Sequence, residues 1–168
     1  MQLTLPMLMT TVGLVLLNCG PSGPDLCEGD EAPMVLIGQG VGGAFVELED
    51  AQEVTLSVAP QGGFGVPVVV QTQGLVAGDD VQSMVVLEPR QGAEILGTFE
   101  TRAPLQCRSD GAGGNVVGVV VGFDPDRYRS NDDLLALDGQ VVELHITVTD
   151  REGRVGVGVK PVTIRVGG

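Results

Sequence analysis

Residues 142–149 have the sequence VELHITVT, and residues 150–153, DREG, follow them directly. Apolar and polar residues alternate through the first segment, which is the pattern of a β-strand with one buried and one exposed face. The residues that this alternation assigns to the core are Val142, Leu144, Ile146 and Val148. A slip of one residue would bury Glu143 and His145 instead, so the alternation determines the register. Because DREG is typical of a turn and valines continue after it, we predict an antiparallel hairpin here.

Short apolar runs separated by turn residues recur through the rest of the chain from Met34 onward. The runs that we expect to form strands are residues 34–37, 44–48, 53–59, 64–72, 81–88, 94–101, 116–123, 142–149 and 155–166. The chain has 26 glycines, ten prolines and no tryptophan, a composition that favours short strands joined by tight turns over helices. Together these features predict an all-β fold, an antiparallel sandwich of two sheets.

Two of these strands carry more specific expectations. Pro67 removes one backbone donor from residues 64–72, so we expect this strand to lie at a sheet edge or to carry a bulge. Residues 116–123 are apolar on both faces, so we place them in the middle of a sheet with cover on both sides.

An uncharged apolar run extends from Leu3 to Leu17 and ends just before Cys19. It is too short for a comfortable membrane span but has the length of the apolar region of a secretory signal. Leu16, Leu17, Asn18 and Cys19 resemble the end of a bacterial lipoprotein signal, in which a leucine stands three residues before a cysteine that becomes acylated.

This resemblance implies that residues 1–18 are a signal peptide and that lipid chains on Cys19 anchor the protein to a membrane. Leu17 and Asn18 are larger than the usual residues at their positions, and no Lys or Arg precedes the apolar run. An uncleaved anchor and soluble secretion are the alternatives. Gly20 and Pro21 follow the cysteine, and the lack of an Asp there points by analogy to the outer membrane, at its periplasmic face or its surface.

The sequence after the acylated cysteine divides into two parts. Residues 19–33 are rich in Gly, Pro and acidic residues, a composition of a flexible tether. Residues 34–168 contain all the predicted strands and form one domain of ordinary size.

Two cysteines remain once Cys19 is assigned to lipid. Cys27 and Cys107 would meet an oxidising compartment after export, so we predict a disulfide between them. It would close a long loop and contribute on the order of 4 kcal/mol by restricting the unfolded chain. A zinc or redox site would need closer ligand spacing, and the chain has one histidine.

The charge and the scarcity of catalytic residues limit the possible functions. The net charge of −13 repels nucleic acids, so a nucleic-acid partner is not expected. His145 lies in mid-strand on the outward face, and no serine stands in a G-x-S-x-G motif. We therefore expect a protein that is not an enzyme and has no cofactor.

The polar loop of residues 124–139 is the longest insertion between predicted strands and the first place to look for function. Its residues Asp124, Asp126 and Asp132 offer oxygen ligands of the kind that Ca²⁺ prefers. Their spacing does not match an EF-hand, and neighbouring arginines compete for the carboxylates. A solvated, salt-bridged loop is the alternative to a calcium site.

Two resemblances extend these expectations. DGQVVELHITVTDREGRVGVGVKPVTIRV, residues 138–166, resembles the closing hairpin of immunoglobulin-like bacterial surface domains. With the lipid signal, residues 38–70 (GQGVGGAFVELEDAQEVTLSVAPQGGFGVPVVV) are similar to uncharacterised predicted lipoproteins of myxobacteria, in which a PQGG turn recurs. The resemblance implies an immunoglobulin-like sandwich and an envelope location, but no activity and no functional residues.

We therefore expect a non-catalytic cell-envelope lipoprotein. Its tethered β-sandwich would present loops or a sheet edge to another, unidentified envelope protein. The alternative is a module that binds Ca²⁺ or a small ligand through the loop of residues 124–139.

Overall fold

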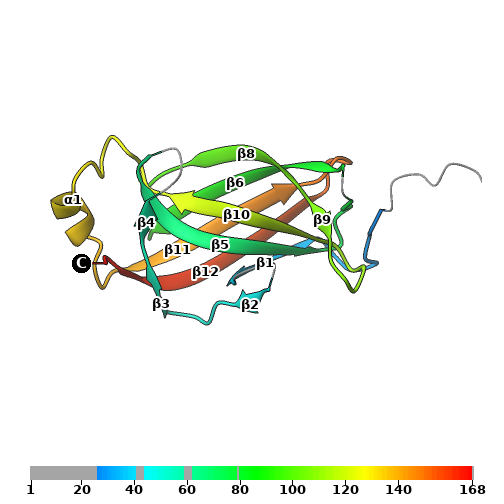
Figure 1. Cartoon of the computed structure of the whole chain (residues 1–168), viewed down its shortest axis with the longest axis horizontal. Helices are drawn as coiled ribbons and strands as arrows, with labels where there is room; N and C mark the ends of the chain where they lie inside the picture. The colour runs from blue at the N-terminus through cyan, green and yellow to red at the C-terminus, as the bar shows by residue number, and fades with distance from the viewer. Residues whose placement is uncertain (1–25, 41–43, 59–61, 79, 168) are drawn as a thin grey trace, which may run out of the picture.

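The computed structural model describes residues 26–40, 44–58, 62–78 and 80–167. Two β-sheets pack face to face, and a short helix, α1 (Asn131–Leu135), lies at one end of them (Figure 1). The predicted all-β sandwich is therefore confirmed. The predicted signal peptide, Cys19 and the first part of the predicted tether lie outside the described residues. In the described part of the chain, no helix is long and apolar enough to span a bilayer.

The first sheet has the strand order β2-β1-β5-β10-β9, and β4 also pairs with β5. Its strands are β1 (Met34–Gln39), β2 (Val46–Glu47), β4 (Ser57–Val58), β5 (Phe64–Gln73), β9 (Gln106–Cys107) and β10 (Gly114–Gly122). The second sheet has the order β3-β12-β11-β6-β7, and β8 also pairs with β6. Its strands are β3 (Gln52–Thr55), β6 (Gln82–Gln91), β7 (Glu94–Ile95), β8 (Phe99–Pro104), β11 (Val141–Thr149) and β12 (Val155–Arg165). Of these pairs, β3 with β12 is parallel and the others are antiparallel.

The order of these strands is that of an immunoglobulin-like sandwich. In such domains the strands A, B, E and D form one sheet in that order, and G, F and C form the other. Here β1-β5-β10-β9 and β12-β11-β6 take these places, and the order along the chain agrees with the letters. One strand is much reduced, because β9, in the place of strand D, has two residues.

The final hairpin has the predicted register. The four apolar residues of β11 assigned to the core, Val142, Leu144, Ile146 and Val148, are all fully buried. Ile146 lies opposite Gly158 and Thr149 opposite Val155, so β11 and β12 pair along the whole length of β11. The period of two thus correctly identified the inner face.

The second strand of the hairpin has glycines on its inner face and valines on its outer face. Gly156 and Gly158 are buried, whereas Val157 is 53% exposed. The reason is the close approach of β1: a Cβ on Gly158 would lie 2.5 Å from the backbone oxygen of Val35. Glycine lets β1 cross β12 at this distance, so the two sheets are in backbone contact here.

The prediction of one strand at residues 94–101 is wrong, because β7 and β8 are separate. Leu96 donates its N–H to the oxygen of Pro89 at 2.8 Å and accepts from the N–H of Asp124 at 2.9 Å. Its side chain is 1% exposed. The bond to Pro89 extends the pairing of β7 with β6 by one residue, and the bond from Asp124 connects the second sheet to the end of β10. The pairing with β6 resumes at Phe99 in a register shifted by one residue.

The prediction that residues 116–123 lie in mid-sheet with both faces covered is also wrong. β10 pairs with β5 on one side, but on the other side β9 reaches only Gly114 and Asn115. The register shifts between Val116 and Val119, which is a β-bulge, and Val117 is 49% exposed. A strand that is apolar on both faces therefore forms an edge here, and its outward apolar residues lie at the surface.

Pro67 lies in the central strand β5, at a point where no neighbouring strand among the described residues pairs with one side of it. Its carbonyl oxygen faces Gln39 of β1, 3.5 Å from Nε2, so its nitrogen faces the same side. On that side β1 pairs as far as Val69 and β4 begins at Gly65, which leaves a gap opposite the proline. The missing N–H therefore removes no ladder hydrogen bond.

The predicted disulfide between Cys27 and Cys107 is present, with a Cα to Cα distance of 5.6 Å. Cys27 also exchanges backbone hydrogen bonds with Ala77, at 3.0 and 2.9 Å. The end of the predicted tether is therefore fixed to the sandwich ahead of β1, at the end opposite α1 (Figure 1).

Candidate functional site

The structure does not bring the predicted calcium ligands together. The Oδ1 of Asp124 accepts a hydrogen bond from the N–H of Asp126 at 2.8 Å, and Asp126 pairs with Arg129 at 3.1 Å. Asp132 lies in the first turn of α1 and is exposed. Among the described residues, no group of three or more His, Cys, Asp or Glu side chains is placed to hold a metal ion.

The loop of residues 124–139 is ordered by hydrogen bonds within itself and by packing against the end of the sandwich. Asp133 accepts from the N–H of Ser130 at 3.0 Å and from its hydroxyl at 2.8 Å, and Ser130 caps α1 in return. The Ser130 hydroxyl bond lowers the pKa of Asp133. Tyr128 is 6% exposed and packs against Phe123 with 5.5 Å between ring centroids, and its burial raises the pKa of its hydroxyl. The loop therefore acts as a cover over one end of the core.

His145 lies on the outer face of the second sheet, as predicted. Its Nε2 is 2.9 Å from the Oε2 of Glu143, which stands two residues away on the same strand face. The pair forms a surface contact, and neither residue lines a cavity with the other candidates.

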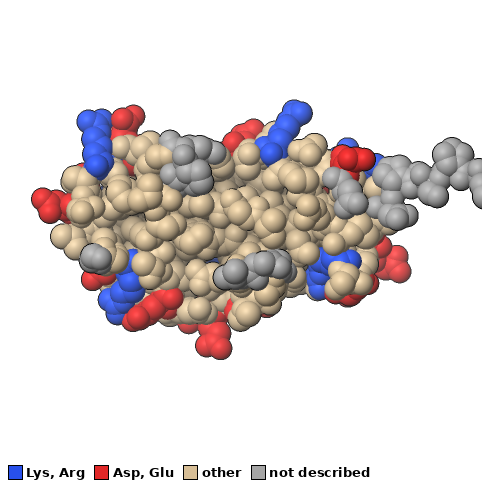
Figure 2. Space-filling view, in the orientation of Figure 1, with Lys and Arg blue, Asp and Glu red and all other residues tan. Residues whose placement is uncertain are grey.

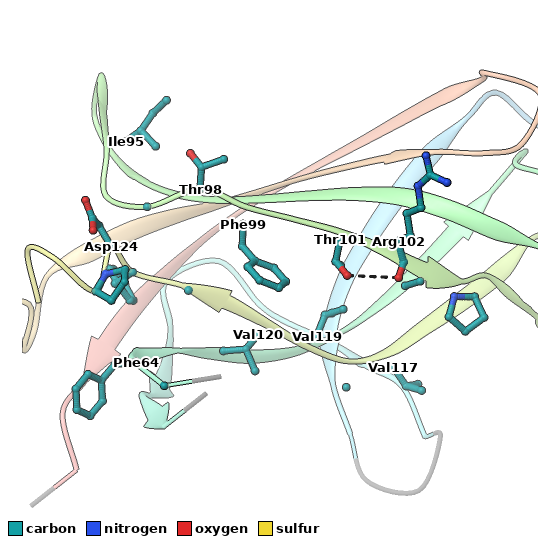
Figure 3. Close-up of a pocket in the computed structure, with 18 residues that line it drawn as sticks. Phe64, Ile95, Thr98, Phe99, Thr101, Arg102, Val117, Val119, Val120 and Asp124 are labelled. Atoms are coloured by element: carbon teal, nitrogen blue, oxygen red, sulfur yellow. Dashed lines mark hydrogen bonds between the residues drawn. The ribbon is translucent and has the colours of Figure 1, made fainter. Parts of the chain in front are cut away.

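A groove of about 720 Å³ lies between β8 and β10, and we call it the edge groove. Figure 3 shows Phe99 of β8 pointing into this space toward Val119 and Val120 of β10. The apolar side chains that line it include Phe64, Ile95, Phe99, Val117, Val119 and Val120. Its volume is within the range of small-molecule sites.

The walls of the edge groove are two strand edges. β8 pairs with β6 on one side, and in the described part of the chain no strand pairs with its other side. Beyond Asn115, β10 likewise has a free edge toward the groove. Phe123 donates its N–H to Phe64 on β5 at 2.9 Å, so by the alternation of the ladder Val121 also faces β5 and Val120 faces the groove.

The bulge in β10 shapes this edge. Gly118 has a φ of 74°, which favours glycine over other residues, and the bulge leaves Val117 at the rim of the groove. At the other end the edge is closed, because a Cβ on Gly97 would lie 2.5 Å from the oxygen of Gly122. The accessible part of the β10 edge is therefore the stretch around Val120.

Charged residues are almost absent from the groove. Asp124 lies at one end, while Arg102 projects from β8 away from β10 (Figure 3). Figure 2 shows the face that carries β5 and β10: Lys, Arg, Asp and Glu lie around its rim, and uncharged residues cover its middle. In a chain with net charge −13, this neutral surface is a distinct feature.

The chain matches no known protein-family model, and no curated protein is significantly similar to it. The groove itself has no local sequence signal, because its lining comes from segments around Phe64, Phe99 and Val117 that are distant in sequence. The one feature of the sequence that indicated the groove was the apolar composition of both faces of residues 116–123. In the structure these residues form a strand edge.

Proposed function

We propose that this protein is a non-catalytic binding module of the cell envelope, anchored by lipid and holding a protein partner in the edge groove. The observation that carries the proposal is the groove itself: two free strand edges enclose a space of about 720 Å³ that is lined by several apolar side chains and few charged ones. Strand edges that lack a partner are surfaces to which other chains pair. His145, the one histidine of the chain, contacts Glu143 outside the groove, which favours binding over acid–base chemistry there.

The position of Cys27 in the fold supports this function. Cys27 is held at the end of the sandwich opposite α1 (Figure 1). A lipid anchor at Cys19 would hold the domain by this end. The edge groove runs along the side of the sandwich and would stay accessible to a partner in the envelope.

The experiment that tests partner binding places a photo-crosslinking amino acid at Val117, on the groove rim, in cells that produce the protein. The matched control is Val157, which is apolar and similarly exposed, 53% against 49%, but lies on the outer face of the second sheet. A protein adduct specific to position 117 is the expected result. Equal adducts at both positions, or none at 117, would contradict the proposal.

The anchor is tested separately by Cys19→Ala. This variant should lose incorporation of labelled fatty acid and leave the lipid-labelled membrane fraction, because the acylated thiol is gone. Asn18→Ala, which keeps the cysteine, is the control and should still be labelled. Unchanged labelling of Cys19→Ala would exclude lipidation at this residue.

A further inference from the structure

We infer that the occupant of the edge groove is an extended peptide segment of the partner, which adds as a strand to the free edge of β10 in the place of a full-length strand D. The inference rests on the proposed function and specifies the class of ligand. The segment has an uncharged, apolar middle and a cationic residue at its N-terminal end.

The backbone of β10 determines the mode of binding. Val120 presents its N–H and C=O to the groove, since Val121 next to it faces β5. In the same sheet β9 pairs antiparallel with β10 but reaches only Gly114 and Asn115. A strand that continues the line of β9 would meet the free backbone groups of β10 in the same antiparallel sense. Such an added strand gains main-chain hydrogen bonds and places alternate side chains in pockets.

The apolar lining alone would also suit an acyl chain, but the groove contains more than apolar side chains. An acyl chain that covered Val120 would take its N–H and C=O from water and offer no partner, which costs free energy. A peptide strand satisfies these groups and can place side chains against Phe99 and Phe64. The combination of strand edges with an apolar lining therefore selects an extended peptide.

The charges around the groove indicate which peptide sequence would bind. No charged side chain points into the middle of the groove, so a charge on the inward side of the segment would be buried without a partner. Asp124 follows the C-terminal end of β10, and the N-terminus of an antiparallel segment lies at that end. A Lys or Arg there would meet the Asp124 carboxylate, and the net charge of −13 attracts such a segment at long range.

The test uses the full chain and a synthetic peptide of alternating valine and threonine with an N-terminal lysine. Val120→Pro removes the N–H that faces the groove and leaves the β5 ladder intact, so affinity should fall about tenfold for one lost hydrogen bond. Val120→Thr keeps this N–H and is the matched control, with unchanged affinity expected. In the complex, hydrogen exchange of the Val120 amide should slow about tenfold or more.

Asp124→Asn should weaken binding of the lysine peptide about threefold at low salt and not affect the same peptide with a neutral first residue. The carbonyl oxygen of the introduced amide can still accept from the N–H of Asp126, so the turn is preserved.

Several outcomes would overturn the inference. These are equal binding to Val120→Pro and Val120→Thr, binding of laurate in place of the peptide, or self-association of the chain through the groove that the peptide does not displace. A specific adduct at position 117 without peptide binding would refute the inference of a strand ligand but would still support the proposed function. Absence of that adduct would remove the proposed function itself.

Discussion

Asp150 is a buried carboxylate that connects the turn between β11 and β12 to the segment after β5, and its replacement by asparagine is the most informative test of the fold. The residue is 5% exposed and lies in the turn between β11 and β12. It accepts hydrogen bonds from the backbone N–H of Val76, Glu152 and Arg154, all at 2.9 Å, and from the Nε of Arg154 at 3.0 Å. The carboxylate therefore holds the turn closed and fixes it to the segment that leaves β5.

In Asp150→Asn, an NH₂ group replaces one carboxylate oxygen. This group is a donor, so it cannot accept the hydrogen bonds that the oxygen accepted. Water can reach Glu152 in the turn, but Val76 is 1% exposed, so its N–H would lose its partner without replacement. A hydrogen bond to a charged acceptor contributes about 1.5–3 kcal/mol, and an unpaired buried donor costs about 1–3 kcal/mol. Because these terms overlap, we expect a loss of about 2–4 kcal/mol in the free energy of unfolding.

The assay is urea unfolding at about pH 7, with Asp30→Asn as the control. Asp30 is an exposed carboxylate without a hydrogen bond or ion pair in the described part of the chain, so its variant should have the wild-type midpoint. Equal midpoints for Asp150→Asn and wild type would refute the reasoning.

The same variant predicts a pH dependence. Burial raises the pKa of Asp150, but the hydrogen bonds from Val76 and Arg154 outweigh it, so the pKa is lowered on folding. A lowered pKa means that the carboxylate stabilises the fold above its unfolded value of about 3.9 and loses this contribution as the pH falls through the folded value. The difference between wild type and Asp150→Asn should therefore be constant near neutral pH and shrink below about pH 4. A difference that grows on acidification would contradict this sign.

Three further predictions follow from the fold. Reduction of the Cys27 to Cys107 bond should lower the free energy of unfolding by about 2–5 kcal/mol, and mass spectrometry of the unreduced chain should recover the linked peptides. Ile146→Ala should cost about 2–5 kcal/mol because its side chain is fully buried, while Thr147→Ala on the outer face should cost little; equal urea midpoints would mean that the register is wrong. Ca²⁺ or EDTA should leave the melting temperature unchanged, because the carboxylates of the 124–139 loop are not gathered into a cluster among the described residues; a rise with Ca²⁺ that EDTA reverses would show a site.

The elements that the sequence predicted correctly are those with a local physical signal. The alternation around Ile146 has one consistent register, and the two cysteines that remain once Cys19 is assigned to lipid have one possible pairing. Val157 shows the limit of such signals: apolar alternation continued through β12, but the close approach of β1 turned its glycines inward. That contact joins residues far apart in the chain, and no local pattern encodes it.

The edge groove was not predictable for a related reason. Residues 116–123 had the composition of a central strand, and the exposure of Val117 depends on a bulge and on the shortness of β9. The interruption after Leu96 accompanies a hydrogen bond from Asp124, which lies beyond β10, and a shift of register between β7 and β8. The envelope location and the lipid on Cys19 stay predictions from sequence.

The position of the disulfide determines how a mechanical load would cross the molecule. A pull on the chain ahead of Cys27 passes through the sulfur bridge to Cys107 in β9, and the chain runs from there directly into β10. A partner held on the β10 edge would therefore be connected to the N-terminal end by a short covalent path. Tension along this path bypasses the hydrogen bonds between β1 and β5 and the packing between the sheets.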